Sequence, residues 1–136
     1  PIGSFLMVVE GGSAGRKLAF LEEEVCFVNK LCAFYSTENT KFQYYFVQSQ
    51  NYQNKFKSTI SGLIGGVSIS NLKNFELPLP PLSEQEEIVK YLEDKTRLID
   101  QKVFFEEKRI ELLKEYRQSL ISELVTGKLM VTEDMI

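Results

Sequence analysis

The feature that most constrains this chain is a run of 43 residues, Ser83–Val125, that contains no glycine or proline. The run opens on a capping box: Ser83 can cap a helix, Glu86 follows three residues later, and Leu82 precedes the cap as a hydrophobic staple. Thr126-Gly127 is a common signal for a helix C-terminus. The sequence therefore predicts one helix of roughly forty residues, about 60 Å long at 1.5 Å per residue.

One face of this predicted helix is apolar. Its residues recur at steps of three, four or their sums, and we call them the helix-pairing seam: Ile88, Leu92, Ile99, Val103, Ile110, Leu113, Leu120 and Leu124. A helix this long cannot bury the seam against a domain of about eighty residues, so we expect a second long helix to cover it. Lys95 and Glu106 fall near seam positions, which favours an antiparallel or irregular pair over a parallel zipper. The alternative is a solvated single helix held by i,i+4 pairs.

A proline-rich segment, Leu77–Leu82, precedes the helix, and prolines disfavour helix in the residue before them. We therefore predict two domains, residues 1–80 and 81–136. Apolar runs in the first predict short strands at Phe5–Val9, Lys17–Leu21, Val25–Val28, Leu31–Tyr35, Val67–Ile69 and Phe75–Leu79. Other spacings predict a helix over Thr37–Gln50 capped by Ser36 or Thr37, a helical stretch from Tyr52 to Ile60, loops at Ser61-Gly62 and Gly65-Gly66, and a turn at Asn71–Asn74. The expected fold class is α+β, a small mixed domain followed by one long helix that pairs in an antiparallel coiled coil.

Charge divides the chain at the same place. Residues 1–80 carry seven basic and six acidic side chains, a net charge of +1. Residues 81–136 carry nine basic and thirteen acidic ones, a net charge of −4. The overall charge of −3 therefore comes from the helix, and the first domain is free to approach a phosphate backbone.

Several classes of function are excluded by what the chain lacks. There is no histidine, which removes His-dependent catalytic triads and most transition-metal sites. No pair of carboxylates has a spacing that indicates acid–base catalysis, and Cys26 and Cys32 favour reduced thiols over a disulfide. We expect no catalytic residue, no metal and no cofactor. No apolar run is long enough to cross a membrane, and the abrupt start at Pro1 suggests a fragment of a longer protein.

The glycine-rich segment Glu10–Lys17 is the first candidate binding element. Closely spaced glycines allow a ligand to approach the backbone, and exposed amides can hold a phosphate. Ser13, Arg16 and Lys17 would add polar and charged contacts, since arginine can also bind a guanine edge. The segment matches neither a Walker loop nor the dinucleotide fingerprint. The alternative is a hairpin loop whose glycines only satisfy turn geometry.

Two further clusters suit the edges of bases and phosphates. Gln48–Ser58 combines amides and hydroxyls with Lys55 and Lys57, and its alternative is an ordinary polar helix face. Ser58–Asn71 is rich in hydroxyls and glycines and leads to Lys73, and its alternative is loop geometry. Together with the glycine-rich segment, these clusters supply the candidate contacts to nucleic acid: Ser13, Arg16, Lys17, Lys55, Lys57, Ser68, Ser70 and Lys73.

Three segments carry a resemblance to a known family. They are Leu77–Gln85 followed by Ile88, Leu113–Ile121, and Thr126–Leu129. The sequence resembles the specificity subunit of type I restriction-modification systems, in which a P-P-L-x-E-Q-x-x-I segment opens a long helix and an L-x-x-x-R-x-x-L-I-x-x-x-V-T-G-K segment closes it. Residues 11–15 and 69–79 resemble, more loosely, the later part of a target recognition domain.

The resemblance implies a cytoplasmic, non-catalytic component that binds half of a bipartite site on double-stranded DNA. It implies contacts with the methyltransferase subunit and, through the complex, with the restriction subunit. With one long helix per chain, two copies could cover each other's seam, so we also expect a homodimer. The alternative function is a coiled-coil assembly module that does not bind DNA itself. A steep dependence of DNA binding on salt would distinguish the two.

Overall fold

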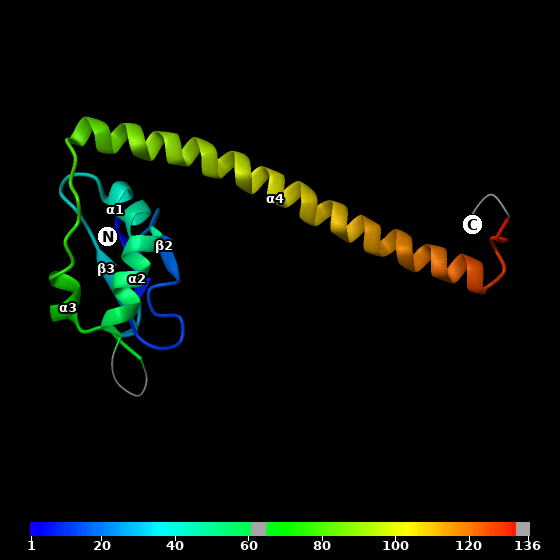
Figure 1. Cartoon of the computed structure of the whole chain (residues 1–136), viewed down its shortest axis with the longest axis horizontal. Helices are drawn as coiled ribbons and strands as arrows, with labels where there is room; N and C mark the ends of the chain where they lie inside the picture. The colour runs from blue at the N-terminus through cyan, green and yellow to red at the C-terminus, as the bar shows by residue number, and fades with distance from the viewer. Residues whose placement is uncertain (61–64, 133–136) are drawn as a thin grey trace. The chain divides into compact units, whose positions relative to one another are not determined.

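The computed structural model describes residues 1–60 and 65–132, so the loop predicted at Ser61-Gly62 lies outside the described residues. The chain divides into two units, Pro1–Leu92 and Glu93–Ile136. The elements are strands β1 (Phe5–Val8), β2 (Leu18–Phe20) and β3 (Leu31–Phe34), then helices α1 (Thr40–Phe46), α2 (Gln50–Thr59), α3 (Ile69–Lys73) and α4 (Leu82–Val125) (Figure 1). The α+β class and the long helix are therefore confirmed.

The sheet is antiparallel, with β1 in the centre and β2 and β3 on either side. Phe5 of β1 faces Phe20 and Phe34 across the ladders. Because side chains alternate along a strand, Phe5 and Met7 share one face of the sheet with their cross-strand neighbours. Phe5 stacks on Phe34 with ring centroids 5.0 Å apart.

The helices cover this aromatic face of the sheet. Tyr52 and Phe56 of α2, Val47 after α1 and Leu72 of α3 form one buried cluster with Phe5 and Met7. Phe56 and Met7 have no exposed surface, and burying side chains of this size contributes about 2 kcal/mol each. The core of the first unit is thus a sheet face packed under short helices, as Figure 1 shows for α1 and α2.

Helix α1 is shorter than the sequence suggests because two side chains cap new helix starts. The Asn39 side chain accepts a hydrogen bond from the amide of Phe42, so α1 begins at Thr40 and neither Ser36 nor Thr37 is its cap. The Ser49 side chain accepts from the amide of Tyr52 and starts α2. The predicted second helical stretch is confirmed, with Tyr52 and Phe56 buried.

Three of the six predicted strands are wrong. Val25–Val28 forms no strand: it lies in the β2–β3 connection, where its side chains stay largely exposed and gain little from pairing at a sheet edge. The segment predicted as a strand at Val67–Ile69 runs instead into α3, because Ser68 caps that helix, and the turn predicted at Asn71–Asn74 is mostly helical. Phe75–Leu79 is extended without ladder partners, as the prolines at 78 and 80 favour.

The start of α4 is anchored by a glutamine. Gln85 is buried, and its amide nitrogen donates to the carbonyl of Pro80 at 2.8 Å and to the carboxylate of Glu38 at 3.2 Å. Val89, one turn later, is also buried. The helix begins at Leu82, two residues earlier than the capping box predicts, so Ser83 lies inside the first turn and the Pro81 carbonyl accepts the first helical hydrogen bonds.

The end of α4 follows the sequence signal. Gly127 has a φ of +73°, and its amide donates to the carbonyl of Leu124. The amide of Lys128 donates to the carbonyl of Glu123 at 2.9 Å, which completes a Schellman motif. In the described part of the chain, α4 and the other helices all fall short of the combined length and hydropathy of a membrane span.

Gly15 is the residue at which the fold leaves no room for a side chain. Its φ is +74°, and a Cβ built on it would lie 2.5 Å from Cδ1 of Phe56. Substituting alanine combines an unfavourable backbone conformation with overpacking of a buried ring, and either effect costs about 1–2 kcal/mol. The close approach fixes the glycine-rich loop to α2.

We therefore expect Gly15→Ala to lower the free energy of unfolding by about 3 kcal/mol in urea titrations. Gly12→Ala is the matched control, because Gly12 lies in the same loop and a Cβ there would meet no atom within 4 Å. Equal stability of the two variants would show that the Gly15–Phe56 contact does not fix the loop.

Candidate nucleic-acid interface

Helix α2 lies at the centre of the sequence-predicted contacts. Tyr52 and Phe56 fix one side of the helix in the core, which leaves the other side to solvent. Lys55 and Lys57 are both exposed there. Two neighbouring elements flank the helix and bring the remaining basic residues beside it.

The glycine-rich loop lies on one flank of α2. The side-chain amide nitrogen of Gln53 donates a hydrogen bond to the carbonyl of Gly15 at 2.7 Å. The loop and the helix are therefore joined by this hydrogen bond as well as by the Phe56 contact. Arg16 and Lys17 follow Gly15 and are exposed. Lys57 is four residues after Gln53 and therefore lies on the same side of the helix, one turn along.

Helix α3 and the segment after it lie on the other flank. The ammonium group of Lys55 is 5.6 Å from the centroid of the Phe75 ring, a cation–π geometry. Phe75 also packs on Tyr52, with ring centroids 5.1 Å apart. Lys73 is exposed in the last turn of α3, two residues before Phe75. Figure 1 shows α2 between α3 and the blue loop that carries the glycines.

The backbone of the glycine-rich loop is occupied by the fold itself. The amides of Gly11, Ala14, Gly15 and Arg16 donate to carbonyls of Gly65, Gly11, Val8 and Ser13. These amides therefore support turn geometry, which was the alternative interpretation of the loop, and they do not hold a phosphate in this conformation. The Arg16 guanidinium donates to the carbonyl of Gly12, yet the side chain is exposed. What the loop offers a ligand is side-chain charge.

The hydroxyl residues divide into structural and exposed ones. The Ser68 side chain accepts from the amide of Asn71 at 3.2 Å and so caps α3. Ser70 is exposed in the first turn of α3, and Ser13 is half-buried in the loop. The Gln53 amide, which belongs to the predicted polar cluster, is bonded to Val47 and Gly15, so its role is structural.

We call the set Arg16, Lys17, Lys55, Lys57 and Lys73 the basic surface. It holds five of the seven basic residues in the stretch 1–80. Lys30, which the sequence analysis did not single out, accepts through its carbonyl from the amide of Val9 and so lies at the same end of β1. Glu22–Glu24 lie in the β2–β3 connection, while Glu10 and Glu76 adjoin the basic elements in sequence. The five residues of the basic surface are thus exposed on three neighbouring elements, the glycine-rich loop, α2 and α3.

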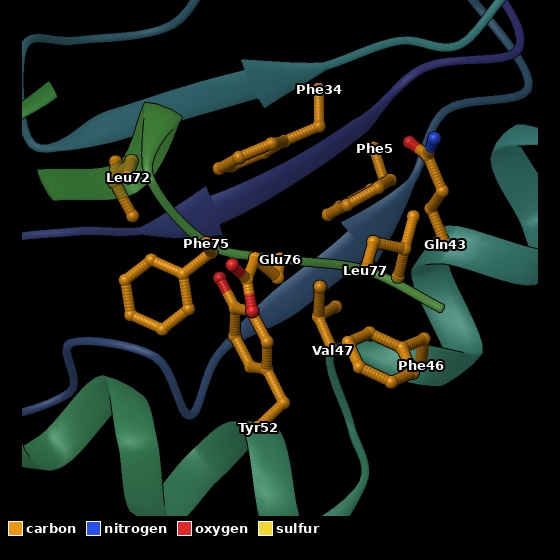
Figure 2. Close-up of a pocket in the computed structure, with 10 residues that line it drawn as sticks. All are labelled: Phe5, Phe34, Gln43, Phe46, Val47, Tyr52, Leu72, Phe75, Glu76 and Leu77. Atoms are coloured by element: carbon orange, nitrogen blue, oxygen red, sulfur yellow. The ribbon is translucent and has the colours of Figure 1, made fainter. Parts of the chain in front are cut away.

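A cavity of about 150 Å³ lies under α1 and α2 (Figure 2). Figure 2 shows the rings of Phe5, Phe34, Phe46, Tyr52 and Phe75 around it, with Gln43 and Glu76 as its polar residues. Burial, with a smaller effect of the Cys32 thiol, raises the pKa of Tyr52 to about 12. Burial also raises the pKa of Cys32, which stays a free thiol, as does Cys26. The cavity belongs to the aromatic core.

The chain thus combines an α+β unit that carries exposed basic residues with a long helix that carries exposed apolar residues. The chain belongs to the type I restriction modification DNA specificity domain family, whose model matches residues 1–115. It is 33% identical over 129 residues to the type I restriction enzyme EcoKI specificity subunit of Escherichia coli (strain K12). That alignment covers 89% of this chain and 26% of the relative, so the chain spans about a quarter of its length. No solved structure gives a significant match.

The titration of Tyr52 gives a prediction for the core. A raised pKa means that the folded state favours the neutral phenol, so this contribution to stability is complete below pH 10 and is lost as the pH rises toward 12. The free energy of unfolding of the wild type should fall by about 2 kcal/mol more over this window than that of Tyr52→Phe. Urea titrations at pH 9 to 12 measure this difference in the free energy of unfolding. The control is Tyr35→Phe, because the Tyr35 ring is 64% exposed. Parallel curves for the wild type and Tyr52→Phe would contradict it.

Proposed function

We propose that this chain recognises DNA sequence for a type I restriction-modification complex and catalyses no reaction itself. It binds one half of a bipartite site on duplex DNA through the first unit. Helix α4 acts as a spacer arm and as a docking surface for the methyltransferase subunit, which brings the restriction subunit into the complex. The observation that carries the proposal is family membership over residues 1–115 combined with the basic surface on α2 and its neighbours.

The residues of the basic surface divide naturally by function. Lysines are point charges that suit phosphates, so Lys17, Lys55, Lys57 and Lys73 position the protein on the DNA backbone. Arg16 can bind a phosphate or a guanine edge in a bidentate way. Ser13 and Ser70 lie on the same two flanking elements and complete the set with neutral hydrogen-bonding groups, while the Ser68 hydroxyl is used as a helix cap.

Helix α4 supports the second part of the proposal. In the part of α4 that belongs to the second unit of the chain, four seam residues are about half exposed: Ile99, Val103, Ile110 and Leu113. Leaving four such side chains in water is unfavourable, since each forgoes on the order of 1 kcal/mol of burial. The seam therefore favours a helical partner, as expected for an arm that joins recognition units.

The competing function is an assembly module without DNA binding. The exposed seam favours it, and the net charge of +1 in residues 1–80 is low for a DNA-binding domain. The two functions differ in how affinity for duplex DNA depends on salt, because binding to phosphates releases counterions. An assembly module shows no such binding.

Fluorescence anisotropy of the full chain with labelled duplex DNA, repeated at several KCl concentrations, tests the DNA-binding function. Each phosphate contact contributes about −0.9 to the slope of log affinity against log salt. Lys57→Ala and Arg16→Ala should weaken binding, and Lys57→Ala should reduce the slope by about one.

Lys41→Ala is the matched control, because the Lys41 ammonium lies over the Phe20 ring and Phe20 pairs with Phe5, at the opposite end of β1 from the glycine-rich loop. Absent binding would favour the assembly module, and equal losses in all three variants would show that the basic surface is not the DNA-binding site.

A further inference from the structure

The exposed side of helix α2 carries a row of neutral hydrogen-bonding side chains that the basic surface does not include. Tyr52 and Phe56 are buried, and residues four apart lie on one side of a helix. Gln50, Asn54 and Ser58 therefore form a row on the opposite side, and all three are exposed. We call these three residues the neutral row. Asn54, its middle member, lies two residues from each buried ring and so points most directly away from the core.

Positive charge lies on both sides of the neutral row. Lys57 is on the side of the glycine-rich loop, which carries Arg16 and Lys17. Lys55 is on the other side, where its ammonium group lies over the Phe75 ring. The exposed surface of α2 therefore has a neutral centre between two positively charged flanks.

Acidic residues are absent from this part of the sequence. The chain has 19 of them, and none lies between Glu38 and Glu76. A carboxylate in the first turn would stabilise α2, yet that turn has no acidic residue. The solvent-facing residues of α4, by contrast, mix both signs of charge. A helix surface without carboxylates suits an approach to phosphates, because like charges placed against each other repel.

Two side chains of the neutral row form a hydrogen-bonded amide pair. The side-chain nitrogen of Gln50 donates to Oδ1 of Asn54 at 2.7 Å. A carbonyl oxygen has two lone pairs, so this oxygen can accept a second hydrogen bond. None of the described residues accepts from the amide nitrogen of Asn54. Asn54 thus presents a donor and an acceptor side by side to solvent, and Gln50 restricts their orientation.

This arrangement of donor and acceptor matches the edge of an adenine. In the major groove adenine presents the N7 acceptor beside the N6 amino donor, and asparagine can bind both at once. Guanine presents two acceptors, N7 and O6, so the Asn54 oxygen would face another oxygen. The Ser58 hydroxyl donates to the carbonyl of Lys55 at 2.7 Å, which leaves its oxygen as an acceptor for the amino group of a neighbouring adenine or cytosine.

We propose that α2 enters the major groove of duplex DNA and that Asn54, held by Gln50, binds the N6 and N7 edge of an adenine. The major groove is about 12 Å wide and admits a helix. A helix in the groove has base edges in front of it and a phosphate backbone on either side, which is the order of neutral and charged residues around α2. The inference rests on the proposed DNA-binding function, and it names the reading element and the base.

Selection of duplex DNA from a library with a randomised segment, followed by sequencing, tests the inference on the full chain. The wild type should select sites with an adenine at one fixed position. Asn54→Ala should lose about tenfold of that preference, the size expected for one bidentate contact to a base, and keep the others. The variant should fold, since alanine is the better helix former. Gln50→Ala should weaken the preference at the same position alone, because Gln50 acts through Asn54.

A modified base tests the contact at the level of single atoms. The base 7-deazaadenine has a C–H group in place of N7 and so lacks the acceptor. Placed at the fixed position of the selected duplex, it should weaken binding of the wild type by about fivefold in fluorescence anisotropy. It should leave the affinity of Asn54→Ala unchanged. An equal loss in both proteins would show that another residue contacts this base edge and would overturn the inference.

Asn29→Ala is the matched control, because Asn29 is an exposed asparagine of the β2–β3 connection, outside α2 and the basic surface. It should keep every preference of the wild type. A wild type that binds DNA with a steep salt dependence but selects no adenine would overturn the inference and leave the proposed function standing, as would an Asn54→Ala variant that selects like the wild type. A chain that binds no duplex DNA would overturn both.

Discussion

The candidate interface depends on the packing of Phe56 against Gly15. This fully buried ring lies where the glycine-rich loop passes closest to α2, and its other neighbours are Tyr52 and Phe75. One side chain therefore joins the loop, the helix and the segment after α3. Since Arg16 and Lys57 belong to the first two of these and Lys73 leads into the third, a single apolar contact holds together charges that are far apart in sequence.

The glutamine in the segment Leu77–Gln85 has an analogous role at the other end of the first unit. Gln85 is buried where a helix leaves the domain, and its amide binds a backbone carbonyl on one side and Glu38 on the other. Its own carbonyl oxygen is buried without a hydrogen-bond partner among the described residues. A leucine at this position could not make these hydrogen bonds. The glutamine of the P-P-L-x-E-Q-x-x-I segment therefore has a structural role: it attaches the first turn of α4 to the domain.

How much could be predicted from the sequence follows from the range of each interaction. The two ends of α4 were predictable to within two residues, because caps and the Gly127 turn are local. Strands β1, β2 and β3 were predictable from their apolar runs. The exposed connection at Val25–Val28 was not, because an apolar run alone does not tell whether the fold buries it. Each basic residue could be identified from the sequence. Their arrangement around α2 could not, because it depends on the Gly15–Phe56 and Lys55–Phe75 contacts, which join residues far apart in sequence.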